Sequence, residues 1–166
     1  MPSLQLNIST LAKETVSECI EKKVTFGTAE SCTGGLISAS VTDVAGASAV
    51  FFGGIVSYDN SVKEKLLGVP AQTLAEKGAV SPETASAMSA GARRALSVDY
   101  AVSVTGIAGP GGGTPSKPVG LVYVSVASEN GIIVTENHFS GDREAVRLQT
   151  VEKALALLLE AVRGHR

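Results

Sequence analysis

Apolar residues recur at the spacing of an α-helix near both ends of the chain and in several segments between them. Near the start, Leu11, Val16 and Ile20 are separated by charged residues, which is the pattern of a helix with one buried face. Ser81 and Pro82 form a helix-start signal, with serine as N-cap and proline at the first helical position. The patterns predict helices over residues 8–22, 36–41, 60–67 (capped by Asn60 or Ser61), 71–77, 82–96 and 143–163.

Short apolar runs between these helices predict buried strands. The runs cover residues 24–29, 49–58, 99–105, 119–128 and 132–140. The last two are joined at Glu129, Asn130 and Gly131, and because Asn-Gly is a common hairpin turn we expect these two strands to pair antiparallel. The alternation of strands and helices predicts a three-layer α/β/α sandwich with a mixed, mostly parallel sheet, formed by one domain over residues 1–166.

The composition agrees with such a core. Of 166 residues 44% are hydrophobic but only 4% are aromatic, so the core must consist of Val, Leu, Ile and Ala, as in a sheet covered by helices on both faces. The net charge is −2 and there is no basic run, which argues against nucleic acid as a partner. Any phosphate that the protein binds should therefore belong to a small molecule.

Cysteine and histidine are too sparse for a metal site. Cys19 and Cys32 form no C-x-x-C pair, and His138 and His165 lie far from both in sequence, so we expect no metal and no cofactor. The uncharged run over residues 44–58 is too short and glycine-rich to cross a bilayer, and no basic leader precedes an apolar segment. We therefore expect a cytoplasmic protein with reduced thiols and no membrane partner.

Three polar segments follow predicted strands and would meet at one edge of the sheet. The first, T-A-E-S-C-T-G-G at 28–35, offers Ser31; the second, 58–63, offers Lys63; and the third, 105–118, is rich in glycine. Such a set suits acyl chemistry, with helix-start N–H groups available for a developing oxyanion. The simpler alternative for 28–35 is a capped helix without chemistry.

Serine needs a base to become a nucleophile, and neither histidine lies in these segments, so a Ser-His-Asp triad is not expected. A desolvated lysine is a known substitute, and Lys63 is the candidate. Tyr58 would relay a proton or keep Lys63 neutral, and Glu30 or Asp59 would anchor an amide nitrogen. The alternative is a solvated surface lysine beside a tyrosine at a strand end.

Cys32 is the rival nucleophile, ranked second because no histidine lies nearby in sequence to activate it. The glycine-rich segment 106–113 matches neither a P-loop nor a dinucleotide fingerprint; it could form an anion nest, a lid or an ordered surface loop. Arg143 and Arg147 are four residues apart and could grip a phosphate or carboxylate, or could simply be exposed helix arginines.

Five motifs, taken in their order along the chain, strongly resemble the C-terminal domain of the competence/damage-inducible CinA family. They are T-A-E-S-C-T-G-G, G-G-I-V-S-Y-D-N-S-V-K-E-K-L-L-G-V, G-A-V-S-P-E-T-A, S-V-T-G-I-A-G-P-G-G-G and F-S-G-D-R-E-A-V-R. The resemblance runs from about Leu6 to Val162. It implies an amidase that hydrolyses nicotinamide mononucleotide to nicotinate mononucleotide and ammonia. Larger family members carry a further N-terminal domain, so the chain looks like the stand-alone form.

The resemblance also implies roles for single residues. Ser31 would be the nucleophile, Lys63 and Tyr58 would activate it, and Thr105 would lie near the reacting group. Arg143 or Arg147 would meet the phosphate. The remaining substrate-binding residues would be Glu30, Cys32, Thr33, Gly34, Asn60, Gly109, Gly111, Gly112 and Gly113.

The expected partner is thus the small-molecule substrate nicotinamide mononucleotide, and we expect a homo-oligomer, as is common for small α/β enzymes. The alternative function is a non-catalytic module that binds a nucleotide and reports on it in competence or the response to DNA damage. Ammonia release distinguishes the two.

Overall fold

The computed structural model describes residues 1–164, so His165, one of the two histidines considered above, lies outside the described residues. These residues form a five-stranded sheet of order β2-β1-β3-β4-β5. The strands are β1 (Phe26–Glu30), β2 (Phe51–Val56), β3 (Tyr100–Gly106), β4 (Leu121–Ser128) and β5 (Gly131–His138). The pairs β1–β2 and β1–β3 are parallel, whereas β3–β4 and β4–β5 are antiparallel, so β4 alone runs against the others.

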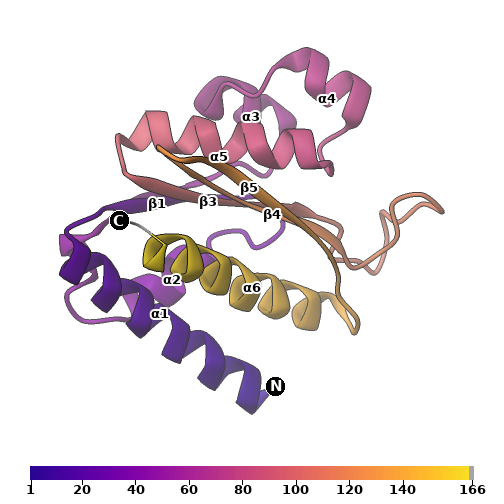
Figure 1. The fold of residues 1–166 in the computed structure, drawn as a ribbon. Helices are drawn as coiled ribbons and strands as arrows, with labels where there is room; N and C mark the ends of the chain where they lie inside the picture. Colours follow the sequence, from indigo (N-terminus) through magenta and orange to yellow (C-terminus); the bar gives the residue numbers. More distant parts are fainter. Residues whose placement is uncertain (165–166) are drawn as a thin grey trace.

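Helices cover both faces of the sheet (Figure 1). They are α1 (Pro2–Lys22), α2 (Leu36–Thr42), α3 (Asn60–Leu67), α4 (Ala71–Lys77), α5 (Pro82–Leu96) and α6 (Arg143–Arg163), with a 3₁₀ turn at Ala47–Ala49. One face carries α5 with α3 and α4 packed beyond it, and the opposite face carries α1, α2 and α6. The expected three-layer α/β/α sandwich with a mixed, mostly parallel sheet is confirmed.

The two central strands are buried along almost their whole length. Every residue of β1 is buried, as are six of the seven residues of β3. The larger core cluster lies between the sheet and α1, α2 and α6, and a smaller one lies under α3 and α5. Short aliphatic side chains make up most of both clusters, which explains the low aromatic content.

All the predicted helices and strands are present, but several of their boundaries differ. The first helix begins at Pro2, six residues before the expected start, because proline is accepted in the first turn of a helix. The second strand ends at Val56 rather than residue 58, since the chain turns there toward α3. The N-cap of α3 is Asp59, whose side chain accepts from the N–H of Ser61, and not Asn60 or Ser61.

The segment 107–120 between β3 and β4, hereafter the glycine-rich loop, projects beyond the sheet (Figure 1). Its base is closed by the hydrogen bonds Ile107 N–H to Leu121 O and Gly120 N–H to Ile107 O. Within it, the Thr114 hydroxyl accepts from the N–H of Lys117, and the Lys117 ammonium donates to the carbonyl of Lys77 at 2.6 Å. The loop is thus tied to the end of α4.

Gly91 in α5 allows α3 to lie close to α5, because a Cβ at this position would overlap the carbonyl oxygen of Leu67. We predict that Gly91→Ala destabilises the protein. Alanine improves helix propensity by about 1 kcal/mol, but the overlap involves backbone and overpacking costs about 1–3 kcal/mol. Urea unfolding should show a net loss, whereas Gly111→Ala, whose Cβ meets nothing within 4 Å, should not. A Gly91→Ala protein as stable as the parent would contradict this close packing.

Candidate active site

The carboxyl ends of the parallel strands β1, β2 and β3 bring three segments together at one edge of the sheet, as the sequence predicted. Ser31 directly follows β1, Lys63 lies in the helix after β2, and Thr105 is in the last part of β3. Together with the glycine-rich loop they border a cavity of about 280 Å³. Its lining residues are Ser31, Cys32, Tyr58, Lys63, Ala79, Val80, Thr105, Gly106, Ile107, Ala108, Gly109, Gly111, Gly112 and Arg143.

The turn that carries Ser31 is organised by the residue before it. The Glu30 side chain is fully buried and its carboxylate accepts five hydrogen bonds of 2.6–3.1 Å. The donors are the Thr33 hydroxyl, the N–H groups of Gly35, Ile37 and Ser38, and the Ser38 hydroxyl. Glu30 therefore joins the end of β1 to the start of α2 and takes part in no cavity wall, contrary to the expectation that it would hold an amide nitrogen of the substrate.

Lys63 points from α3 toward Ser31 and is only 1% exposed. Its ammonium nitrogen lies 3.1 Å from the Ser31 hydroxyl, 2.7 Å from the carbonyl oxygen of Ser57 and 3.1 Å from the carbonyl oxygen of Tyr58. Within residues 1–164 no carboxylate lies within ion-pair distance of it. Burial therefore lowers the pKa of Lys63 below its ordinary value, and the Asp59 carboxylate only partly opposes this shift.

This arrangement can activate a hydroxyl group. A neutral lysine amine has two N–H groups and one lone pair. The two carbonyls of Ser57 and Tyr58 can accept the two N–H groups, which leaves the lone pair directed at the Ser31 hydroxyl. The pair Ser31–Lys63 thus has the geometry of a nucleophile and its base.

Cys32 lines the same cavity but differs from Ser31 in its chemistry. Its side chain is buried, and burial raises the pKa of the Cys32 thiol to about 12, with a further increase from the Glu30 carboxylate. A thiol of such a pKa is protonated at neutral pH and is therefore a poor nucleophile. Ser31 therefore stays the first candidate nucleophile and Cys32 the second.

Tyr58 and Arg143 form one side of the cavity mouth. The Tyr58 side chain is 62% exposed, and its hydroxyl accepts a hydrogen bond from Arg143 at 3.2 Å. Arg143 also donates to the carbonyl of Gly109 in the glycine-rich loop at 2.7 Å. The predicted proton relay from Tyr58 to Lys63 is not seen, since Tyr58 contacts Lys63 through its main-chain carbonyl and not through its hydroxyl.

Thr105 lies at the inner wall and is almost fully buried. Its hydroxyl donates to the carbonyl of Ala79 at 2.7 Å, so its proton is already engaged and its oxygen lone pairs remain to accept a hydrogen bond. Ala79 and Ser57, which hold Thr105 and Lys63 in place, were missed by sequence reasoning. They act through main-chain carbonyls, which every residue has, so no side-chain pattern could mark them.

Six of the predicted substrate-binding residues do not line the cavity. They are Glu30, Thr33, Gly34, Asn60, Gly113 and Arg147. Asn60 is exposed at the start of α3, and the Thr33 hydroxyl donates to Glu30. Arg147 donates to the carbonyls of Cys32 and Thr33, so of the two arginines only Arg143 reaches the cavity.

Residues 1–164 contain no group of three or more His, Cys, Asp or Glu side chains that could hold a metal ion. His138, on the edge strand β5, pairs at 2.8 Å with Glu136, away from the cavity. No helix in this part of the chain is long and apolar enough to cross a bilayer.

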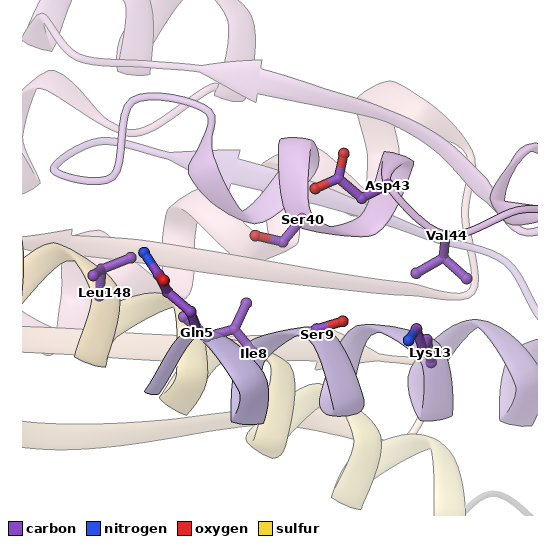
Figure 2. A pocket seen from close by; sticks show the side chains of 8 residues that line it. All are labelled: Gln5, Ile8, Ser9, Lys13, Ser40, Asp43, Val44 and Leu148. Carbon is purple, nitrogen blue, oxygen red and sulfur yellow. The ribbon is translucent and has the colours of Figure 1, made fainter. Parts of the chain in front are cut away.

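A second cavity of about 200 Å³ lies between α1 and α2, on the α1–α2–α6 face of the sheet (Figure 2). Its lining combines apolar and polar side chains and includes one lysine and one aspartate. The lining residues are Gln5, Ile8, Ser9, Lys13, Ser40, Asp43, Val44 and Leu148. No predicted site residue lies there.

The fold is that of a known protein family. The model of the CinA C-terminal domain matches residues 8–162, and the chain therefore belongs to that family. A CinA-like protein of Leptospira borgpetersenii is 54% identical over 145 residues, which are 87% of this chain and 35% of the relative. A CinA-like protein of Geobacter sulfurreducens is 55% identical over 135 residues, 81% of this chain and 33% of the relative. The chain spans about a third of the length of these relatives.

Solved structures agree over nearly the whole chain. The competence/damage inducible protein CihA from Agrobacterium tumefaciens is 43% identical, with a TM-score of 0.91 and coverage of 95% of this chain and 96% of that one. The competence damage-inducible protein A from Klebsiella pneumoniae is 33% identical, with a TM-score of 0.92 and coverage of 96% and 99%. The names of these proteins refer to competence or damage and state no reaction.

We predict that Glu30→Gln destabilises the protein by about 2–4 kcal/mol, because an amide cannot accept at both ends and would leave buried N–H groups of α2 unpaired. Urea unfolding should show this loss, and any activity should fall with it. The matched variant Glu129→Gln removes an exposed carboxylate in the β4–β5 turn and should stay within about 0.5 kcal/mol of the parent. Equal midpoints for both variants would show that Glu30 does not anchor the turn.

Proposed function

We propose that this chain is a serine amidase that converts nicotinamide mononucleotide to nicotinate mononucleotide and ammonia. The observation that carries the proposal is the 3.1 Å contact between the Ser31 hydroxyl and a buried Lys63 that has two carbonyl acceptors and no carboxylate. The contact lies at the wall of a cavity that suits a small molecule. The substrate is the one implied by the resemblance to CinA-type amidases.

In the proposed reaction, Lys63 removes the Ser31 proton while the serine oxygen bonds to the carboxamide carbon. Backbone N–H groups of the turn after Ser31 stabilise the resulting oxyanion. The carbon–nitrogen bond then breaks, and the lysine proton goes to the leaving ammonia. A water molecule, deprotonated by the same lysine, attacks the acyl-serine ester and releases the carboxylate product and free Ser31.

Two further residues fit this substrate. The Thr105 oxygen has its proton engaged by Ala79 and would accept a hydrogen bond from the NH₂ group of the carboxamide. Arg143 uses two N–H groups for Gly109 and Tyr58 and has others to offer a phosphate at the cavity mouth. The N–H groups of the glycine-rich loop would add to that phosphate site.

The free and buried Cys19 and Cys32 agree with the reducing cytoplasm as the place of action, which is part of the proposal. The names of the relatives would instead suit a module that reports on a bound nucleotide. Such a module would bind nicotinamide mononucleotide without releasing ammonia, so a single assay separates the two functions.

Ammonia release from nicotinamide mononucleotide by the purified protein is the first test. We expect turnover in the parent and a loss of about 10⁴-fold or more in Ser31→Ala and Lys63→Ala, because the nucleophile and its base act as a unit. Cys32→Ser, at the neighbouring position in the same cavity, should keep most of the activity. Near-normal turnover in Ser31→Ala, or binding by calorimetry without any ammonia from the parent, would refute the proposed reaction.

The dependence of kcat/KM on pH tests the role of Lys63. The base must be neutral, so kcat/KM should fall about tenfold per pH unit below the lowered pKa of Lys63 and level off above it. Asp59→Asn keeps an N-cap residue for α3 but removes a carboxylate that raises the Lys63 pKa, so the acidic limb should move to lower pH. A limb that is absent, or that moves to higher pH in Asp59→Asn, would exclude Lys63 as the base.

A further inference from the structure

Arg147, one of the two arginines that the resemblance offered for the substrate phosphate, is directed at the main chain beside Ser31. Its Nε donates to the carbonyl oxygen of Cys32 at 3.2 Å, and its Nη2 donates to the carbonyl oxygen of Thr33 at 2.9 Å. Within residues 1–164 it makes no ion pair with a carboxylate. Both printed hydrogen bonds of this half-buried guanidinium go to the peptide groups Cys32–Thr33 and Thr33–Gly34, close after Ser31.

These two contacts set the directions of the N–H groups in the turn. In a trans peptide the C=O and the N–H point in opposite directions. Holding the Cys32 carbonyl therefore directs the Thr33 N–H away from Arg147. Holding the Thr33 carbonyl likewise directs the N–H of Gly34. This N–H donates to the Ser31 carbonyl at 3.1 Å. That hydrogen bond fixes the peptide between Ser31 and Cys32, which carries the Cys32 N–H.

Charge adds to this geometric effect. The Glu30 carboxylate is fully buried next to Ser31, and its charge opposes the build-up of negative charge on a substrate oxygen nearby. The cation of Arg147, from α6, contacts the same turn and offsets the negative charge of Glu30. It also polarises the two peptide groups that it contacts, which strengthens their N–H groups as donors.

We propose that Arg147 is a positioning residue that holds the turn after Ser31, so that the N–H of Cys32, which lines the cavity, serves as the oxyanion hole for attack by Ser31. The proposal rests on the acyl-transfer chemistry proposed above but not on the identity of the substrate. Arg147 itself touches no substrate atom. Its removal should therefore impair the chemical step and leave binding of the ground state nearly intact.

The two arginines at the start of α6 provide a matched comparison. In Arg147→Gln we expect kcat to fall about 10²–10³-fold, the usual effect of losing an oxyanion donor, with little change in KM. In Arg143→Gln we expect mainly a higher KM, because this side chain lies in the cavity mouth. Arg163→Gln removes the same charge from the exposed end of α6 and should leave both constants unchanged.

A second readout avoids nicotinamide mononucleotide altogether. A fluorophosphonate probe reacts with an activated serine as the serine oxygen bonds to phosphorus and fluoride leaves, while charge develops on the phosphoryl oxygen. The rate of labelling at Ser31 should fall in Arg147→Gln, recover partly in Arg147→Lys, and stay at the parental value in Arg163→Gln. Urea midpoints measured for the same variants show whether a loss follows from unfolding.

The inference would be overturned if folded Arg147→Gln kept the parental labelling rate and the parental kcat. It would also be overturned if Arg147→Lys lost as much as Arg147→Gln and a lowered urea unfolding midpoint fully accounted for the loss. If the parent reacts with the probe but releases no ammonia from nicotinamide mononucleotide, the proposed substrate is wrong and the role of Arg147 is still decided by the labelling rates. If the parent does neither, both proposals are wrong.

Discussion

The buried carboxylate of Glu30 is the interaction on which the site depends. An ionised group without water is costly unless hydrogen bonds replace its hydration, and five donors from the turn and the first residues of α2 do so here. These bonds tie the last residue of β1 to α2 and leave the chain between them little freedom. Ser31 occupies the first position of that fixed segment, so its location follows from an interaction in which it takes no part.

Lys63 presents the opposite case at the same site. Its nitrogen is as buried as the Glu30 carboxylate, but its acceptors are neutral carbonyls and the Ser31 hydroxyl. The buried carboxylate of Glu30 is thus fully hydrogen-bonded and serves the fold, whereas Lys63 has no ion-pair partner among residues 1–164, which suits it to proton transfer. The different behaviour of Glu30 and Lys63 follows from their hydrogen-bond partners and not from depth of burial alone.

The sequence predicted the layers and the central pair of residues because both leave side-chain signals. Helical spacing, apolar runs and the Ser81–Pro82 start are visible in the letters, and so is the placement of Ser31 and Lys63 after neighbouring strands. The roles of Glu30 and Arg147 could not be predicted in the same way. A carboxylate and a guanidinium beside the candidate site suggest ligand contacts. Both side chains instead bind main-chain N–H and C=O groups, whose directions only the folded chain defines.

The cavity takes its walls from both helical layers. Lys63 comes from the layer of α3 and α5, while Arg143 comes from α6 on the opposite face of the sheet, and the glycine-rich loop connects the two sides at the edge. A chain with only one helical layer packed on the sheet would have either Lys63 or Arg143 at the cavity, but not both. The pair Ser31–Lys63 and the cavity mouth are therefore assembled together only once both layers are in place, so a partly folded chain would lack the proposed activity.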